Sequence, residues 1–121
     1  MTVTVTPTGV DHVAINVEDV PAAITFYTEV LGLTQNHERP DFGFPGAWLD
    51  AGGQQVHLIE LPPAPNVGQH FALLYADLDA VVAALRAQGL EVSDPNPSGP
   101  GRHQAFTTDP WGNSIELHNH V

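Results

Sequence analysis

The sequence has 121 residues, of which 42% are hydrophobic, a size that suits one compact domain and is too short for two ordinary ones. It contains no cysteine, which excludes disulfides, thiolate metal sites and a cysteine nucleophile. Fourteen acidic residues against three basic ones give a formal charge of −11, which disfavours binding to nucleic acid and to anionic membranes. With no long apolar stretch and no secretion-type leader, the sequence predicts a cytoplasmic protein.

The first half of the chain is predicted to form a strand, a helix and three shorter strands. Apolar residues alternate with other residues from His12 to Val17, which is the period of a strand with two different faces. Asp19 is a typical helix N-cap, and Gly32 suits the left-handed position that follows a helix. Shorter strands separated by Pro and Gly are expected at about 34–39, 46–51 and 54–60.

The second half repeats this order. "QHFALLYADLDAVVAALRAQGL" from Gln69 is similar to "DHVAINVEDVPAAITFYTEVLGL" from Asp11, which indicates a duplicated unit. Short strands are expected here at about 90–93, 103–108 and 113–119. The proline-rich segment 62–68 reads as a stiff connector, and 93–102 reads as a mobile loop over the site. We therefore expect a single domain over residues 1–121, with one module at about 8–61 and the other at about 68–121.

Seven histidines are many for so short a chain, and imidazole is both a metal ligand and a proton carrier near neutral pH. The duplication selects among them. His12 and His70 open the first strand of their halves, 58 positions apart. His57 in "VHLI" and Glu116 in "IELH" hold matching places in the last strands. These four side chains are candidate metal ligands in two matched pairs.

Strand alternation gives a separate check, because a ligand must point away from the face that the helix covers. In all four strands the large apolar residues lie opposite the candidate ligand. Glu60 falls on the apolar face and is the weaker choice, whereas His118 shares the Glu116 face and is either a rival ligand or part of a polar tail. A strand histidine without an ion would be a hydrogen-bonded core or rim residue. As a set, three imidazoles and a carboxylate suit one divalent ion such as Zn, Ni, Co, Mn or Fe(II).

Candidate substrate-binding residues are fewer. Trp48 and Phe42 can line a pocket, although ordinary packing is the preferred interpretation of each of them. Arg39 and Arg102 stand out because basic residues are scarce, and either can hold an anionic group of a small-molecule substrate or be a solvated surface residue.

The motifs of this chain resemble the vicinal oxygen chelate superfamily, which includes glyoxalase I, fosfomycin-resistance proteins, methylmalonyl-CoA epimerase, extradiol dioxygenases and bleomycin-binding proteins. The resemblance covers nearly the whole chain, and the single-domain glyoxalase I-like branch is the most similar. It is carried by the segments "DHVAINVEDVPAAITFYTEVLGL", "FPGAWLDAGGQQVHLIELP", "QHFALLYADLDAVVAAL" and "DPWGNSIEL".

This resemblance implies an α+β fold in which two βαβββ modules form a cup-shaped, partly open mixed β-barrel with flanking helices, usually in a homodimer. His12, His70 and Glu116 match three of the family's metal ligands. His57 stands where glyoxalase I-type enzymes carry Glu or Gln, so it either binds the metal or acts as an acid/base.

Three functions are compatible with these residues. The first is a glyoxalase I-like lyase or isomerase in which the ion holds vicinal oxygens of the substrate while Glu116, or metal-bound water, moves a proton. The second is an Fe(II) extradiol dioxygenase with His12, His70 and Glu116 as ligands and His57 as a proton donor. The third is a non-enzymatic protein that sequesters a small molecule, as in bleomycin resistance.

Overall fold

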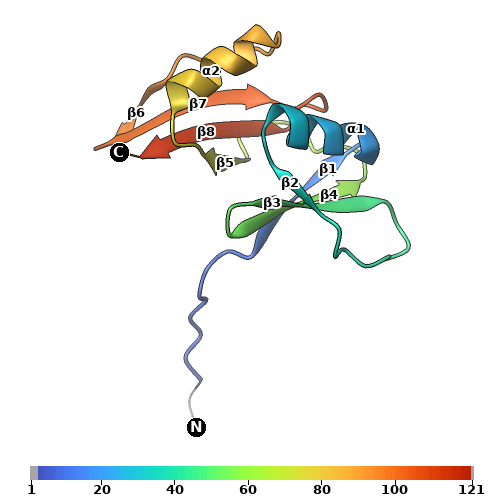
Figure 1. Ribbon diagram of the computed structural model, residues 1–121. Coiled ribbons are helices and arrows are strands. Elements are labelled where there is room, and N and C mark those ends of the chain that lie inside the picture. Colours follow the sequence, from blue (N-terminus) through green and yellow to red (C-terminus); the bar gives the residue numbers. More distant parts are fainter. Residues whose placement is uncertain (1–2, 121) are drawn as a thin grey trace. The chain divides into compact units, whose positions relative to one another are not determined.

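The structure is a computed structural model that describes residues 3–120, and its elements follow the predicted duplicated order (Figure 1). The chain divides into two compact units. Unit 1 contains the residues up to 15 together with 19–60, and unit 2 contains 16–18 together with the residues from 61 onward. The described strands form two four-stranded sheets.

Unit 1 is built on a sheet with the strand order β1-β4-β3-β2. The strands are β1 (His12–Val17), β2 (Thr34–Asn36), β3 (Gly46–Ala51) and β4 (Gln54–Glu60). β3 and β4 pair antiparallel, with Trp48 opposite His57. Alternate residues of β4 divide between two environments, because Val56 and Leu58 are almost fully buried while His57 is half-buried on the other face.

The helical segment of unit 1 packs against β3 and β4. It begins as α1 (Val20–Thr25) and ends in a π-helical turn, η1 (Phe26–Val30), where a regular helix was predicted. The Asp19 carboxylate accepts the Ala22 N–H at 3.0 Å, which confirms the predicted cap. Glu60 accepts the Val20 N–H at 3.3 Å, so this carboxylate lies at the helix N-terminus.

Unit 2 has the corresponding order β5-β8-β7-β6. Its elements are β5 (His70–Leu74), α2 (Leu78–Ala87), β6 (Asn96–Gly99), β7 (Arg102–Thr108) and β8 (Ser114–His120). β8 pairs parallel with β5 and antiparallel with β7, so neighbours hold its backbone on both sides. α2 covers one face of β7 and β8, where Ile115 and Leu117 are fully buried (Figure 1).

A turn stabilised by side chains sets the start of β8. Asp109 is buried, and its carboxylate accepts the N–H groups of Trp111 and Asn113 as well as the Asn113 side-chain amide. The same Asn113 amide group donates to the Asn16 carbonyl at 2.9 Å. The turn therefore fixes where β8 begins, and with it the positions of the following side chains.

Two strand predictions were wrong in position. No strand forms at 90–93, because the carbonyls of Glu91 and Val92 accept hydrogen bonds from the side chains of Thr107 and Arg86. The edge strand β6 lies instead at 96–99, inside the segment predicted as a loop. The strand predicted at 34–39 ends at Asn36, whose side-chain oxygen accepts the Glu38 N–H and turns the chain.

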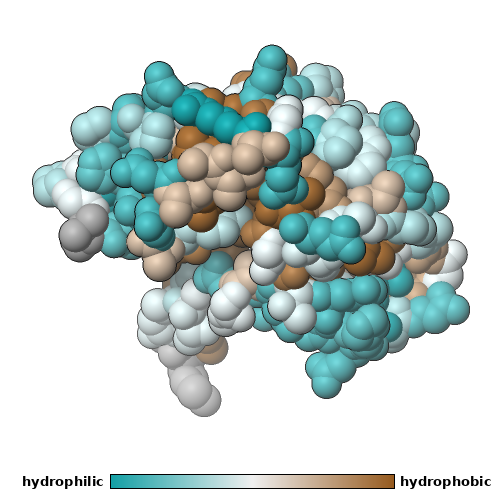
Figure 2. All heavy atoms as spheres, turned by 45° about the horizontal axis from the view of Figure 1, so that its top comes forward, coloured by the Kyte–Doolittle hydropathy of each residue, from teal (hydrophilic) through white to brown (hydrophobic). Residues whose placement is uncertain are grey.

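The surface carries mainly polar side chains. Figure 2 shows hydrophilic residues over much of the face in view, with apolar side chains exposed between them. Phe42 and Phe44 are among the large apolar residues that are about half exposed. Within residues 3–120, no helix has the length and apolar character needed to cross a membrane.

Candidate metal centre

Unit 1 brings His12 and His57 together. Their rings are stacked with centroids 3.8 Å apart and planes inclined by 14°. The opposite face of the His57 ring is covered by Trp48, at a centroid distance of 4.8 Å and an angle of 9°. His57 is therefore held between two parallel rings, which fixes the plane of its imidazole.

A chain of hydrogen bonds also fixes the tautomer of His57. Asp50 can only accept, so the Gln55 amide directs its NH₂ group at the Asp50 carboxylate, 3.2 Å away. The Gln55 oxygen then faces His57 Nε2 at 2.8 Å, which requires Nε2 to carry the proton. A neutral His57 consequently has its lone pair on Nδ1.

Both imidazoles of unit 1 are suited to act as donors. Burial lowers the pKa of His57 below its usual value of 6.5, and the neighbouring His12 lowers it further. His12 Nδ1 donates to the Asp11 carboxylate at 2.9 Å, which leaves Nε2 as its lone-pair nitrogen. A neutral imidazole whose other nitrogen is hydrogen-bonded is the usual state of a metal ligand.

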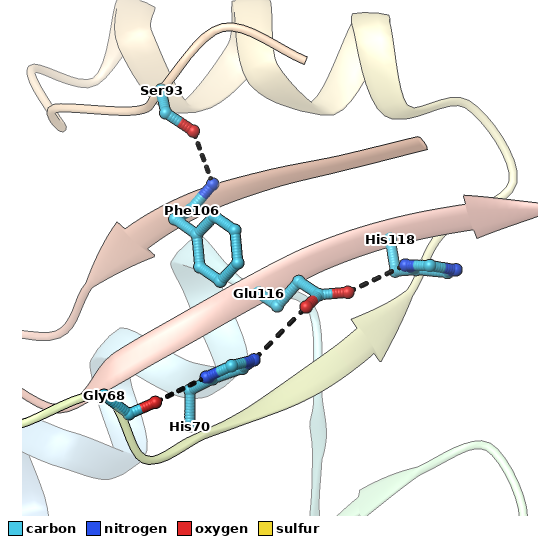
Figure 3. A network of polar contacts seen from close by, with 6 residues as sticks. All are labelled: Gly68, His70, Ser93, Phe106, Glu116 and His118. Carbon is cyan, nitrogen blue, oxygen red and sulfur yellow. Dashed lines mark hydrogen bonds and ion pairs between the residues drawn. The ribbon is translucent and has the colours of Figure 1, made fainter. Parts of the chain in front are cut away.

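Unit 2 brings His70 and Glu116 together (Figure 3). His70 Nδ1 donates to the Gly68 carbonyl at 2.9 Å, while Nε2 lies 3.2 Å from Glu116 Oε1. The other carboxylate oxygen, Oε2, accepts from His118 Nδ1 at 2.7 Å. Glu116 and His118 are two residues apart in β8, so they share one face of the strand, away from buried Ile115 and Leu117.

The predicted ligands thus occur as one pair in each unit. The Glu116 carboxylate lies between His70 and His118 and contacts both. Among residues 3–120, no three His, Asp or Glu side chains have the spacing of an ion site. The donors nevertheless fit a divalent ion chemically. A carbonyl only accepts, so a neutral His70 directs its lone pair at the Glu116 carboxylate, a pairing that a cation relieves.

A pocket of about 560 Å³ lies beside the unit 1 pair. Its walls are the rings of His12, His57 and Trp48 together with Asp11, Asp50 and the hairpin residues 52–55. Its two carboxylates and three rings favour an uncharged or cationic group of a ligand over an anionic group.

The other predicted substrate-binding residues have different surroundings. Phe42 lies 6.3 Å from Trp48 between ring centroids, next to Phe44. The Arg39 guanidinium lies over Phe42 and Phe44, at 5.0 and 5.2 Å from their ring centroids, and donates to the Phe44 carbonyl. Arg39 therefore holds the aromatic loop, whereas Arg102 is exposed at the start of β7 in unit 2.

Asp50, Gln55 and the contact between His118 and Glu116 were not predicted from the sequence. The sequence did contain a signal for the contact of Gln55 with His57 and for that of His118 with Glu116. Gln55 and His118 lie two positions from His57 and Glu116, so strand alternation places each beside its ligand. The orientation of the Gln55 amide depends on Asp50, which reaches it only through the pairing of β3 with β4.

Residues 9–117 match the Glyoxalase/Bleomycin resistance protein/Dioxygenase superfamily. The chain belongs to this superfamily. The predicted family is confirmed, and the two four-stranded mixed sheets with their helices confirm the predicted α+β fold class.

Relatives in this superfamily include lyases. A lactoylglutathione lyase of Arabidopsis thaliana is 33% identical over 88% of this chain, although the chain spans only 42% of that plant protein. A probable lactoylglutathione lyase of Vibrio cholerae is 31% identical, and the alignment covers 88% of this chain and 86% of the relative. A glyoxalase family protein from Bacillus anthracis has a similar crystal structure, with a TM-score of 0.86, 25% identity, and coverage of 98% of this chain and 100% of that one.

Proposed function

We propose that this protein is a divalent-metal-dependent lyase or isomerase of glyoxalase I type, acting on a small molecule that offers vicinal oxygens. The observation that supports this most is the pairing of donors. Each unit presents two candidate ligands from matching strand positions, and each donor has an outer hydrogen-bond partner that orients it.

The proposed ligands are His12 and His57 from unit 1 with His70 and Glu116 from unit 2. Three neutral imidazoles and one carboxylate suit Zn, Ni, Co, Mn or Fe(II). The two pairs of ligands would come either from one chain or from the two chains of a homodimer. We infer a homodimer, because homodimers are usual in the superfamily.

The chain's own residues would move the proton. When bound, the ion supplies Lewis-acid polarisation of a substrate carbonyl. Glu116 is the proposed base, because a carboxylate can take a proton from the carbon beside that carbonyl and return it to the neighbouring carbon. If His57 is not bound to the ion, its Nδ1 lone pair can accept a proton during this transfer, because burial lowers the pKa of the ring and keeps it neutral at the start. No oxidant or reductant is needed.

The substrate is proposed to lie against Trp48 in the unit 1 pocket. The names of the relatives favour a hemithioacetal that is converted to a lactoyl thioester. Phe42, and Arg39 beside it, would close the aromatic side of this pocket, and Arg102 would be available for an anionic group of the substrate.

A second candidate is an Fe(II) extradiol-type dioxygenase. One contact bears on it: Gln55 holds the Nε2 proton of His57, so the Nδ1 lone pair of a His57 that is not a ligand would be free to accept a proton from a catechol. His12, His70 and Glu116 would then be the ligands, and catechols the substrates.

Metal-free protein loaded separately with Ni, Co, Zn and Mn, and then given the glutathione hemithioacetal of methylglyoxal, tests the first proposal. Thioester formation with at least one ion, lost in Glu116→Gln, is the expected result. Anaerobic loading with Fe(II) followed by a catechol panel tests the second, because only that reaction consumes O₂. Inactivity in both assays, together with tight binding of an aromatic compound, would favour sequestration instead.

A further inference from the structure

We propose that His118 is a positioning residue that holds the Glu116 carboxylate in the orientation needed to bind a divalent ion. The inference rests on the proposed metal centre and assigns a role to a residue outside its four ligands.

The contact between the two side chains is short and sheltered. His118 Nδ1 lies 2.7 Å from Glu116 Oε2, and the side chains are 14% and 13% exposed. Both come from β8, which is paired on either side, so neither backbone can shift easily. His70 faces the opposite carboxylate oxygen (Figure 3). One oxygen of Glu116 is therefore occupied by His118, and the other is turned toward His70.

His118 has a feature that packing does not explain. Because a carboxylate only accepts, Nδ1 carries the proton and Nε2 is left with a lone pair. That Nε2 is buried and has no hydrogen-bond partner among residues 3–120. A buried acceptor without a partner destabilises a fold, so an apolar side chain would serve packing better at this position. The bond from Nδ1 to Glu116 accounts for the presence of a histidine here.

This bond has a defined consequence for ion binding. A glutamate side chain can rotate its carboxylate, and an outer donor on one oxygen selects one rotation and directs the other oxygen at the ion. Removing such an outer partner typically weakens metal affinity about tenfold to hundredfold. His118 should therefore affect affinity without adding a fifth ligand.

Two substitutions separate this role from simple packing. Asn places an amide N–H near the position of an imidazole Nδ1, so His118→Asn can keep the bond to Glu116. His118→Leu fills a similar space with no donor. His37→Leu, in an exposed turn after β2, is a control for the loss of one histidine. Circular dichroism and thermal unfolding of the metal-free proteins establish that each variant folds.

The measurement is the affinity for Zn²⁺ alone, by competition with a chromogenic chelator. His118→Leu is expected to bind about tenfold to hundredfold more weakly than the wild type. His118→Asn and His37→Leu are expected to stay close to the wild type.

Equal affinity of His118→Leu and the wild type would overturn the inference. Equal and severe losses in His118→Asn and His118→Leu, as large as in His70→Leu, would also overturn it, because His118 would then be a ligand itself. A wild-type protein that takes up no Zn²⁺ would overturn the proposed metal centre, and this inference with it, before any variant is compared.

Discussion

Nε2 of His70 lies 3.2 Å from Oε1 of Glu116, while Nδ1 of the same ring donates to a backbone carbonyl. In a neutral ring this places a lone pair against a carboxylate. Such a pair is stable when a cation is shared between the two groups, either a proton on the ring or a metal ion. The contact makes this face of β8 a natural place for a cation to bind.

The first prediction concerns the charge of Glu116. Zn²⁺ at about 100 times its dissociation constant is expected to stabilise the wild type by about 2.7 kcal/mol, because it binds the folded chain alone. Glu116→Gln keeps the shape but removes the charge, so most of this stabilisation should be lost. Urea unfolding with and without Zn²⁺ measures it, with Glu29→Gln, an exposed residue of η1, as control. Equal stabilisation of Glu116→Gln and the wild type would contradict the role of Glu116.

The second prediction concerns the tautomer of His57. The chain of hydrogen bonds from Asp50 through Gln55 places the proton on Nε2. Nitrogen-15 spectra of the metal-free protein are therefore expected to show His57 in the Nε2–H form. Gln55→Leu should convert the ring to a mixture of tautomers, while Gln88→Leu at the end of α2 should not. A wild-type ring protonated on Nδ1 would contradict the assignment.

Much of the fold could be predicted because its signals are local. Alternation identified the strands at 46–51 and 54–60 with the bounds that the structure has, and the cap Asp19 was recognisable from residue type. β6 could not be predicted, since an exposed edge strand has no apolar face and this one contains Pro97. The π-helical turn of η1 likewise has no distinct residue pattern.

The candidate site was predictable only in part, because some of its contacts leave no local pattern in the sequence. The four candidate residues follow from repeat symmetry, which matches His12 with His70 and His57 with Glu116. The structure brings His12 to His57 and His70 to Glu116 within their own units. Their outer partners depend on side-chain orientation. The hydrogen bond of Gln55 to His57 is set by a carboxylate on the neighbouring strand, which no pattern within β4 reveals.

A third prediction uses Trp48 as a reporter. Its ring is stacked on His57, and Trp111→Phe leaves it as the sole tryptophan. Ni²⁺ bound by His57 should quench the fluorescence of Trp48 strongly, because the ion lies next to the stacked rings. His57→Leu in the same background should abolish most of the quenching. Unchanged emission in a protein shown to contain Ni²⁺ would mean that the ion binds elsewhere.

A fourth prediction concerns alkaline pH. Burial raises the pKa of Tyr75 to about 12, from an ordinary value of 10.0. The unfolded chain loses this proton at lower pH than the folded one, so the contribution of Tyr75 to stability is complete below pH 10 and falls as the pH rises toward 12. Tyr75→Phe should flatten this decline in urea unfolding. An identical alkaline decline in the variant would show that Tyr75 is not its source.

The central claim is that matched donors from both units bind one ion, and the Zn²⁺ content of three proteins tests it most directly. Elemental analysis after saturation and removal of free ion is expected to give one Zn²⁺ per wild-type chain. His12→Leu in unit 1 and His70→Leu in unit 2 should each reduce that content far below one. The claim would be contradicted by a wild type without Zn²⁺, by two ions per chain, or by a loss that follows substitutions in one unit only.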